Sequence, residues 1–124
     1  MDQKHIDLIK RLIKSTKDKK VEWQKSSAKW QYKLELKAAS FVIDKYFDAE
    51  LTCNPEDPAT VYSLNMYNGE NTEIRIAIAS DFPVEDSDYQ LLVQLYMEAE
   101  ESCVRENETI AKVIEELDIL DLPF

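Results

Sequence analysis

The spacing of hydrophobic residues predicts a helix near the start of the chain. The apolar positions recur every three or four residues and are Ile6, Ile9, Leu12 and Ile13. This spacing places them on one face of an α-helix, with charged residues on the other. Lysines follow between positions 17 and 20, where positive charge suits the negative end of a helix dipole. We expect an amphipathic helix of about three turns.

From residue 21 onwards hydrophobic residues alternate with polar ones, which is the period of a β-strand. The clearest run has its apolar or aromatic side chains at Trp30, Tyr32, Leu34 and Leu36. We expect all four on the buried face of one strand. Weaker runs predict a preceding strand over residues 21–25 and a following strand over residues 41–47.

Two further alternating runs predict a hairpin. Its apolar positions are Tyr62, Leu64 and Met66 on the first strand and Ile74, Ile76 and Ile78 on the second. Asn68 and Gly69 predict the turn between them, and we expect Gly69, the only glycine, to adopt a positive φ. Two prolines within residues 53–58 predict a loop before the hairpin, because proline has no amide hydrogen for a ladder.

The last third of the chain returns to helical spacing. Ser87 and Gln90 have the spacing of a capping box and predict the start of a helix. Its apolar face consists of Leu92, Leu95, Tyr96, Ala99 and Cys103. A further helix is expected over residues 108–117, and the side chains that it should bury are Ile110, Val113, Ile114 and Leu117.

These elements predict an α+β fold: an N-terminal helix, an antiparallel β-meander of about five strands, and C-terminal helices packed on one face of the sheet. The chain has 124 residues, of which 44% are hydrophobic, so it is long enough for one core and too short for two. We expect a single domain over residues 1–124, with residues 118–124 as a C-terminal tail.

Composition also predicts where the protein works. No run approaches the roughly 20 apolar residues that span a bilayer, and the charged N-terminus is unlike a signal peptide. We therefore expect a cytoplasmic protein with no membrane contact. Cys53 and Cys103 lack a metal-ligand spacing, so in a reducing compartment they are expected as free thiols unless the fold brings them together.

Charge divides the chain into two unlike parts. Residues 1–47 hold 12 basic and six acidic residues, whereas residues 48–124 hold three basic and 19 acidic ones. The balances of +6 and −16 give the net charge of −10. Either the two oppositely charged parts attract each other within the fold, or they form two surfaces for different partners.

Candidate catalytic residues are few. The only histidine, His5, falls on the expected exposed side of the first helix, and one glycine cannot form a phosphate-binding loop that needs several. Asp81, Glu85, Asp86 and Asp88 are potential ligands of a hard cation, yet they lack the spacing of a calcium-binding loop. The sequence therefore predicts that the protein is not an enzyme and holds no metal or cofactor.

Lysines and aromatic residues are interleaved over residues 17–37, as in proteins that bind single-stranded nucleic acid. The candidate contacts are Lys17, Lys19, Lys20, Trp23 and Lys25. Against this hypothesis, Trp30 and Tyr32 share the parity of the buried strand positions, and aromatic rings in a core cannot stack on bases. A packed core with solvated lysines is favoured, and nucleic-acid binding stays open.

The sequence ends in ELDILDLPF. Its last four residues, Asp121, Leu122, Pro123 and Phe124, resemble the acidic C-terminal tip of bacterial single-stranded DNA-binding proteins. That resemblance implies that the tip docks into basic pockets of repair and replication proteins; the alternative is that these apolar residues fold back on the core. The layout of the whole chain is similar to that of small uncharacterised bacterial and phage proteins, which implies no activity.

Three functions follow from these observations. The favoured one is a non-catalytic interaction protein that binds an unidentified protein partner through its acidic C-terminal half. The second is a single-stranded nucleic-acid accessory protein with a partner-docking C-terminal tip. The third is an inhibitor whose acidic helices imitate a nucleic-acid backbone. The sequence does not indicate an oligomeric state.

Overall fold

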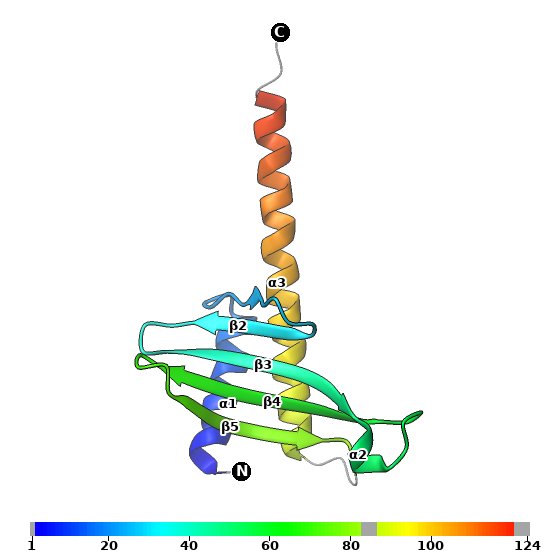
Figure 1. Ribbon diagram of the computed structural model, residues 1–124. Coiled ribbons are helices and arrows are strands. Elements are labelled where there is room, and N and C mark those ends of the chain that lie inside the picture. The colour runs from blue at the N-terminus through cyan, green and yellow to red at the C-terminus, as the bar shows by residue number, and fades with distance from the viewer. Residues whose placement is uncertain (1, 83–86, 121–124) are drawn as a thin grey trace.

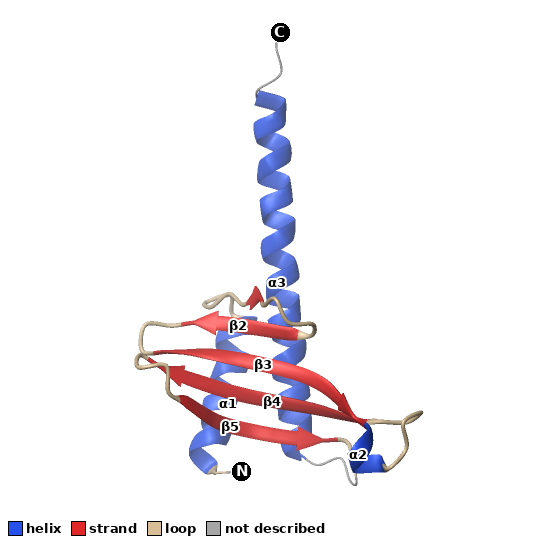
Figure 2. Cartoon of the chain, in the orientation of Figure 1, coloured by secondary structure: helices blue, strands red, loops and turns tan. Residues whose placement is uncertain are grey.

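The computed structural model describes residues 2–82 and 87–120 of the chain, which form three helices and five strands. The helices are α1 (Gln3–Lys17), the short α2 (Ala49–Thr52) and α3 (Ser87–Leu120). The strands are β1 (Gln24–Lys25), β2 (Gln31–Glu35), β3 (Ala39–Asp48), β4 (Ala59–Asn68) and β5 (Glu73–Ser80). The predicted α+β fold is confirmed, and its sheet lies between the N-terminal and C-terminal helices in the sequence (Figure 2).

The five strands form one antiparallel meander in the order β1-β2-β3-β4-β5. β3 and β4 make its longest pairing, from Ala39 opposite Asn68 to Asp48 opposite Ala59. α1 and α3 contact each other and cover one face of this sheet (Figure 1). The molecule therefore has two layers, with its core between the helix pair and one sheet face.

The core contains most of the side chains that periodicity had predicted. On the sheet these are Tyr32, Leu34, Tyr62 and Leu64, and on the helices Ile9, Leu12, Ile13, Leu92, Leu95, Tyr96 and Ala99. Phe41 and Ile43 of β3 also belong to the core. Asp2 caps the first helix, because its side chain accepts a hydrogen bond from the backbone N–H of Lys4. Alternation and helical spacing thus identified the correct buried faces for both kinds of element.

The prediction for Trp30 and Leu36 is wrong. Their side chains are 37% and 45% exposed, although those of Tyr32 and Leu34 between them are buried. β2 covers only Gln31–Glu35, so these two residues lie just outside the strand on either side. Trp30 moreover has a φ of 58°, a left-handed conformation that is unusual for a bulky residue.

The hairpin of β4 and β5 also differs from its simple alternating pattern. Leu64 pairs with Ala77 and Asn65 pairs with Arg75, so Ile76 is an extra residue in a β-bulge. Ile76 is buried, whereas Ile78, which pairs with Ser63 beyond the bulge, is exposed. Ile74 pairs with Met66 near the other end of β5 and is 38% exposed.

In the turn of this hairpin the expected positive φ of Gly69 is wrong. No glycine has a positive φ, and Asn71 adopts one instead, with a φ of 62°. Asn68 organises the turn, because its side-chain oxygen accepts hydrogen bonds from the backbone N–H groups of Glu70 and Thr72.

The two C-terminal helices that the sequence predicted are one continuous helix, α3, of 34 residues. No glycine or proline interrupts residues 87–120, so nothing in this segment stops the helix. At 1.5 Å per residue α3 is about 51 Å long. Its first half packs on the sheet, and the rest projects beyond the edge formed by β1 and β2 (Figure 1).

Candidate interaction surface on the C-terminal helix

The second half of α3, residues 104–120, stands away from the body of the protein and is called the projecting half below. It has an unburied apolar face. Ile110, Val113, Ile114 and Leu117 are each between 48% and 54% exposed, and Leu120 is 75% exposed. We call these five residues the outer stripe. The prediction that Ile110, Val113, Ile114 and Leu117 are buried is therefore wrong.

The outer stripe continues the apolar face that packs on the sheet. Seven-residue steps connect Tyr89, Tyr96, Cys103, Ile110 and Leu117. The parallel series holds Leu92, Ala99, Val113 and Leu120, with Glu106 at the position between Ala99 and Val113. The members of both series up to Cys103 are buried, and those from Ile110 onwards are exposed. A repeat of this kind is the seam of a helix that packs against another element along its length. In α3 the body covers the first half of that seam only.

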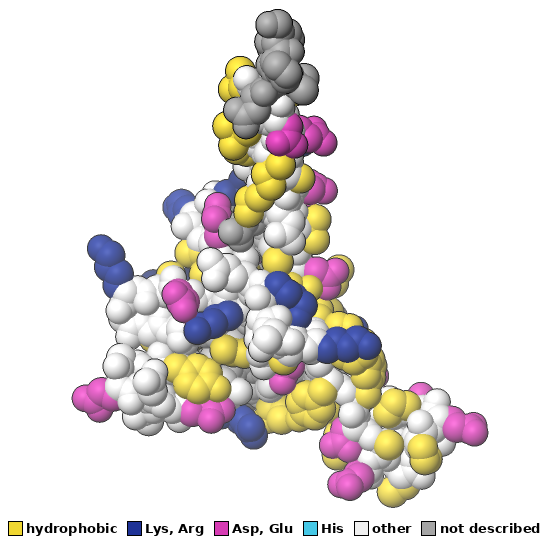
Figure 3. Space-filling view, turned by 45° about the horizontal axis from the view of Figure 1, so that its top comes forward, with side chains coloured by type: hydrophobic (Ala, Val, Ile, Leu, Met, Phe, Trp, Pro, Cys, Tyr) yellow, Lys and Arg dark blue, Asp and Glu magenta, His cyan; other side chains and the backbone are white. Residues whose placement is uncertain are grey.

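Charge distinguishes the projecting half from ordinary helix surface. It holds two basic and five acidic residues, a balance of −3. The acidic side chains of Glu115, Glu116 and Asp118, which we call the acidic tip, gather towards its end. Figure 3 shows hydrophobic side chains following one side of this segment with acidic ones beside them (Figure 3). The surface is therefore apolar along its stripe and negative at its far end.

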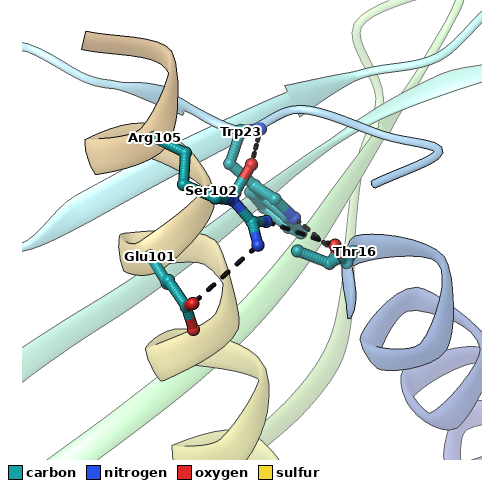
Figure 4. Close-up of polar contacts among 5 residues, drawn as sticks. All are labelled: Thr16, Trp23, Glu101, Ser102 and Arg105. Carbon is teal, nitrogen blue, oxygen red and sulfur yellow. Dashed lines mark hydrogen bonds and ion pairs between the residues drawn. The ribbon is translucent and has the colours of Figure 1, made fainter. Parts of the chain in front are cut away.

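A set of hydrogen bonds fixes the direction in which α3 leaves the body (Figure 4). The backbone N–H of Trp23 donates to the Ser102 hydroxyl at 3.1 Å, and its indole N–H donates to the Thr16 hydroxyl at 3.0 Å. Arg105 donates to the Thr16 carbonyl oxygen at 3.4 Å and pairs with Glu101. These bonds join the end of α1, the segment before β1 and the midpoint of α3, so the helix is held where its projecting half begins.

Trp23 is a structural residue. Its side chain is 0% exposed, so it cannot stack on a nucleic-acid base, and this part of the nucleic-acid hypothesis is wrong. The lysines that were grouped with it, Lys17, Lys19, Lys20 and Lys25, have exposed side chains. The Lys25 ammonium group donates to the backbone carbonyls of Ser26 and Ala28.

The structure shows an exposed aromatic pair that sequence reasoning missed. The rings of Trp30 and Phe47 meet edge to face with centroids 5.0 Å apart, and Phe47 is 45% exposed. The Lys29 ammonium lies 4.4 Å from the centre of the Trp30 ring, and that of Lys45 lies 5.7 Å from the Phe47 ring. Both aromatic residues lie at strand ends, where the alternation along the strand no longer determines which side chains are buried. That position was the signal from which their exposure could have been predicted.

Three titratable groups, on β2, β3 and α3, have shifted pKa values. Burial raises the pKa of Tyr96, as does its contact with Tyr32, and burial likewise raises the pKa of Tyr32. Burial raises the pKa of Asp44, against a hydrogen bond from the backbone of Lys45 that lowers it. Asp44 faces Ser63 across β3 and β4. Because their pKa values are raised, Tyr32 and Tyr96 are neutral packing groups at physiological pH.

The other predicted candidates that the structure describes do not gather into a site, and Glu85 and Asp86 of the acidic cluster lie outside the described residues. Among the residues that the structure describes, no group of three or more histidine, cysteine or acidic side chains is placed to hold a metal ion. His5 is half-buried and Asp81 accepts a hydrogen bond from the backbone N–H of Thr60. Cys53 is exposed and Cys103 buried, and both are free.

The predicted partner-binding residues Asp121, Leu122, Pro123 and Phe124 lie outside the described residues. Residues 118–120 of the expected tail are the last part of α3. Within the described residues, no helix has the length and apolarity needed to cross a membrane.

Comparisons with protein-family models, with curated proteins and with solved structures find no match to this chain. The surface described above must therefore be interpreted from its own geometry and charge.

Proposed function

We propose that this is a non-catalytic interaction protein whose projecting half of α3 binds an α-helix of a partner polypeptide. The observation that supports this proposal is the outer stripe, which extends a buried heptad seam into solvent. Large apolar side chains scattered singly on a surface need no explanation, but a contiguous apolar face usually marks a binding site. A helix in the partner fits best, because a heptad seam is complementary to another seam.

The energetics favour binding through this stripe. Fully burying a valine, leucine or isoleucine side chain contributes about 1.5–3 kcal/mol, so covering five half-exposed ones contributes roughly 5 kcal/mol from this side alone. A partner seam supplies a similar amount, and the sum is comparable to the roughly 4–15 kcal/mol that association costs. The complex should therefore be reversible.

Charge defines the partner further. The partner helix should carry basic residues where it passes the acidic tip, because Glu115, Glu116 and Asp118 repel an acidic neighbour. Contacts of this kind at the rim of an interface set orientation and association rate more than affinity. The proposed partner element is thus a basic amphipathic helix or helix end.

A synthetic peptide tests this proposal directly. We expect a three-heptad peptide with leucine seams and flanking lysines to bind the full chain, and the variant Leu117→Asp to bind it at least tenfold more weakly. The new carboxylate would be buried in the apolar seam without a partner. Isothermal titration calorimetry measures both affinities.

Ile119 provides a matched control. It is 60% exposed on the same turn of α3 but lies off the seam, so Ile119→Asp should bind the peptide as the unmodified chain does. Equal loss in both variants would show that only the general charge of the helix end matters. No binding to the unmodified chain, or undiminished binding to Leu117→Asp, would refute the proposal.

A second candidate function rests on the Trp30–Phe47 pair with Lys29 and Lys45, since exposed rings beside lysines are the elements of a single-stranded nucleic-acid site. If this surface binds a labelled oligothymidine at low salt, Trp30→Ala should weaken binding by about tenfold, because stacking contributes roughly 1–3 kcal/mol per base. Fluorescence anisotropy measures this, with Tyr46→Ala as a control because Tyr46 is equally exposed and lies on the other face of β3. Absence of salt-dependent binding would exclude this function.

A further inference from the structure

We propose that a hollow at the start of the outer stripe receives one large apolar side chain from the end of the partner helix. This inference rests on the proposed function, because it names a further contact of the same partner. The hollow, called the basal hollow below, has a volume of about 320 Å³. One of its walls is α3, and the other is the segment between α1 and β1 that contains Lys19, Val21 and Glu22.

The basal hollow is continuous with the outer stripe. Its wall on α3 consists of Ser102, Arg105, Thr109 and Ile110, and Ile110 is also the first residue of the stripe. Thr109 precedes Val113 by four residues, so these two side chains are neighbours on one face of the helix. A partner helix that covers the stripe and continues towards the body therefore reaches the hollow within about two turns.

The polar groups on the α3 wall already have partners within the chain. The Ser102 hydroxyl accepts a hydrogen bond from the segment before β1, and the Thr109 hydroxyl donates to the backbone carbonyl of Arg105. The Arg105 side chain donates to the Thr16 carbonyl oxygen and pairs with Glu101. Because these groups are satisfied, a polar or charged ligand gains little by replacing their partners.

Apolar contact therefore decides what fits the basal hollow. Val21 is partly buried and packs against the core, and Ile110 is 49% exposed, so both have apolar surface left to bury. On the wall after α1, Lys19 and Glu22 carry opposite charges, which selects neither an anion nor a cation. The occupant is thus a large aliphatic or aromatic side chain, the kind that anchors an interface when a pocket receives it.

The variant Val21→Asp provides the first test. It should bind the three-heptad leucine–lysine peptide about tenfold more weakly than the unmodified chain, because the apolar occupant would cover a carboxylate. Thr109→Asp should have the same effect from the exposed wall of the hollow, where the substitution does not touch the core. Isothermal titration calorimetry measures the affinities, and circular dichroism checks that each variant keeps its fold.

Lys20→Ala is the matched control. It changes the net charge by the same amount as Val21→Asp and lies next to it in the chain, but Lys20 does not line the hollow. Its affinity for the peptide should therefore equal that of the unmodified chain. Undiminished binding to Val21→Asp and Thr109→Asp, or an equal loss in Lys20→Ala, would overturn the inference.

A double-mutant cycle with the peptide identifies the occupant. The last seam leucine at each end of the peptide is replaced by alanine in turn. At least one of these replacements should weaken binding to the unmodified chain by about fivefold to tenfold, because less apolar surface enters the hollow. The same replacement should have little effect on binding to Val21→Asp. A terminal leucine that contributes equally in both chains lies elsewhere, and the inference would be wrong.

These experiments separate this inference from the proposed function. If peptide binding depends on Leu117 but not on Val21 or Thr109, the projecting half binds a helix and the basal hollow takes no part. If the peptide does not bind the unmodified chain at all, both proposals are wrong.

Discussion

Replacing Trp23 with alanine should reduce the free energy of unfolding by about 3–5 kcal/mol, since the substitution removes a large buried ring and leaves a cavity. The side chain is 0% exposed and its indole N–H donates to the Thr16 hydroxyl. A domain of this size is stable by roughly 5–15 kcal/mol, so the loss is a large fraction of the total. Urea unfolding followed by far-UV circular dichroism measures it without using tryptophan fluorescence.

The other tryptophan is the control for this substitution. Trp30 is 37% exposed and its main contact is the edge-to-face pair with Phe47, so Trp30→Ala should cost only about 1 kcal/mol. Similar losses for both variants would contradict the structural role given to Trp23. A smaller substitution, Trp23→Phe, retains most of the ring volume and should lose about 1 kcal/mol for the missing indole donor.

The contrast between these tryptophans also shows what periodicity can predict. The alternation of Tyr32 and Leu34 correctly identified the buried face of β2, because side chains of a strand alternate between its two faces. Trp30 has the same parity, yet the strand begins one residue later and the backbone turns into a left-handed conformation. Parity determines burial only while the residue stays within the ladder.

The outer stripe illustrates a different limit. The repeat that connects Cys103, Ile110 and Leu117 is visible in the sequence, and it correctly predicted one apolar face of a helix. The sequence does not state what covers that face. We expected the sheet to do so, but the sheet ends at β1 and covers α3 only up to about Cys103. Helical periodicity indicates that some surface should cover the apolar face. It does not indicate whether that surface belongs to the same chain.

The bulge at Ile76 has a similar origin. Ile74, Ile76 and Ile78 alternate perfectly in the sequence, and a regular strand would bury all three on one face. One extra residue between the pairs of Leu64 and Asn65 places Ile74, which pairs with Met66, and Ile78, which pairs with Ser63, on opposite faces of the sheet. Such an insertion leaves no composition signal here, because neither glycine nor proline occurs in β5.

The substitution Lys112→Pro should separate the projecting half of α3 from the body of the protein. Proline at this position removes the hydrogen bond to the carbonyl of Glu108 and its ring clashes with that carbonyl, which costs about 3 kcal/mol within the helix. Only eight residues of the described helix then follow, too few to form a helix alone. We expect the projecting half to lose its helical structure and the chain to lose helix pairing.

The body should be little affected by this change. The core packs against α3 up to Cys103, and the Trp23–Ser102 hydrogen bond also lies before the substitution. The free energy of unfolding obtained from urea titration should therefore remain within about 0.5 kcal/mol of its original value, as for a surface substitution. Circular dichroism at low concentration should show less helix, and Lys112→Ala, which keeps the helix, should preserve both helicity and pairing. A large drop in the midpoint for Lys112→Pro alone would mean that the projecting half stabilises the body within one chain, and the interaction surface would then have to be sought elsewhere.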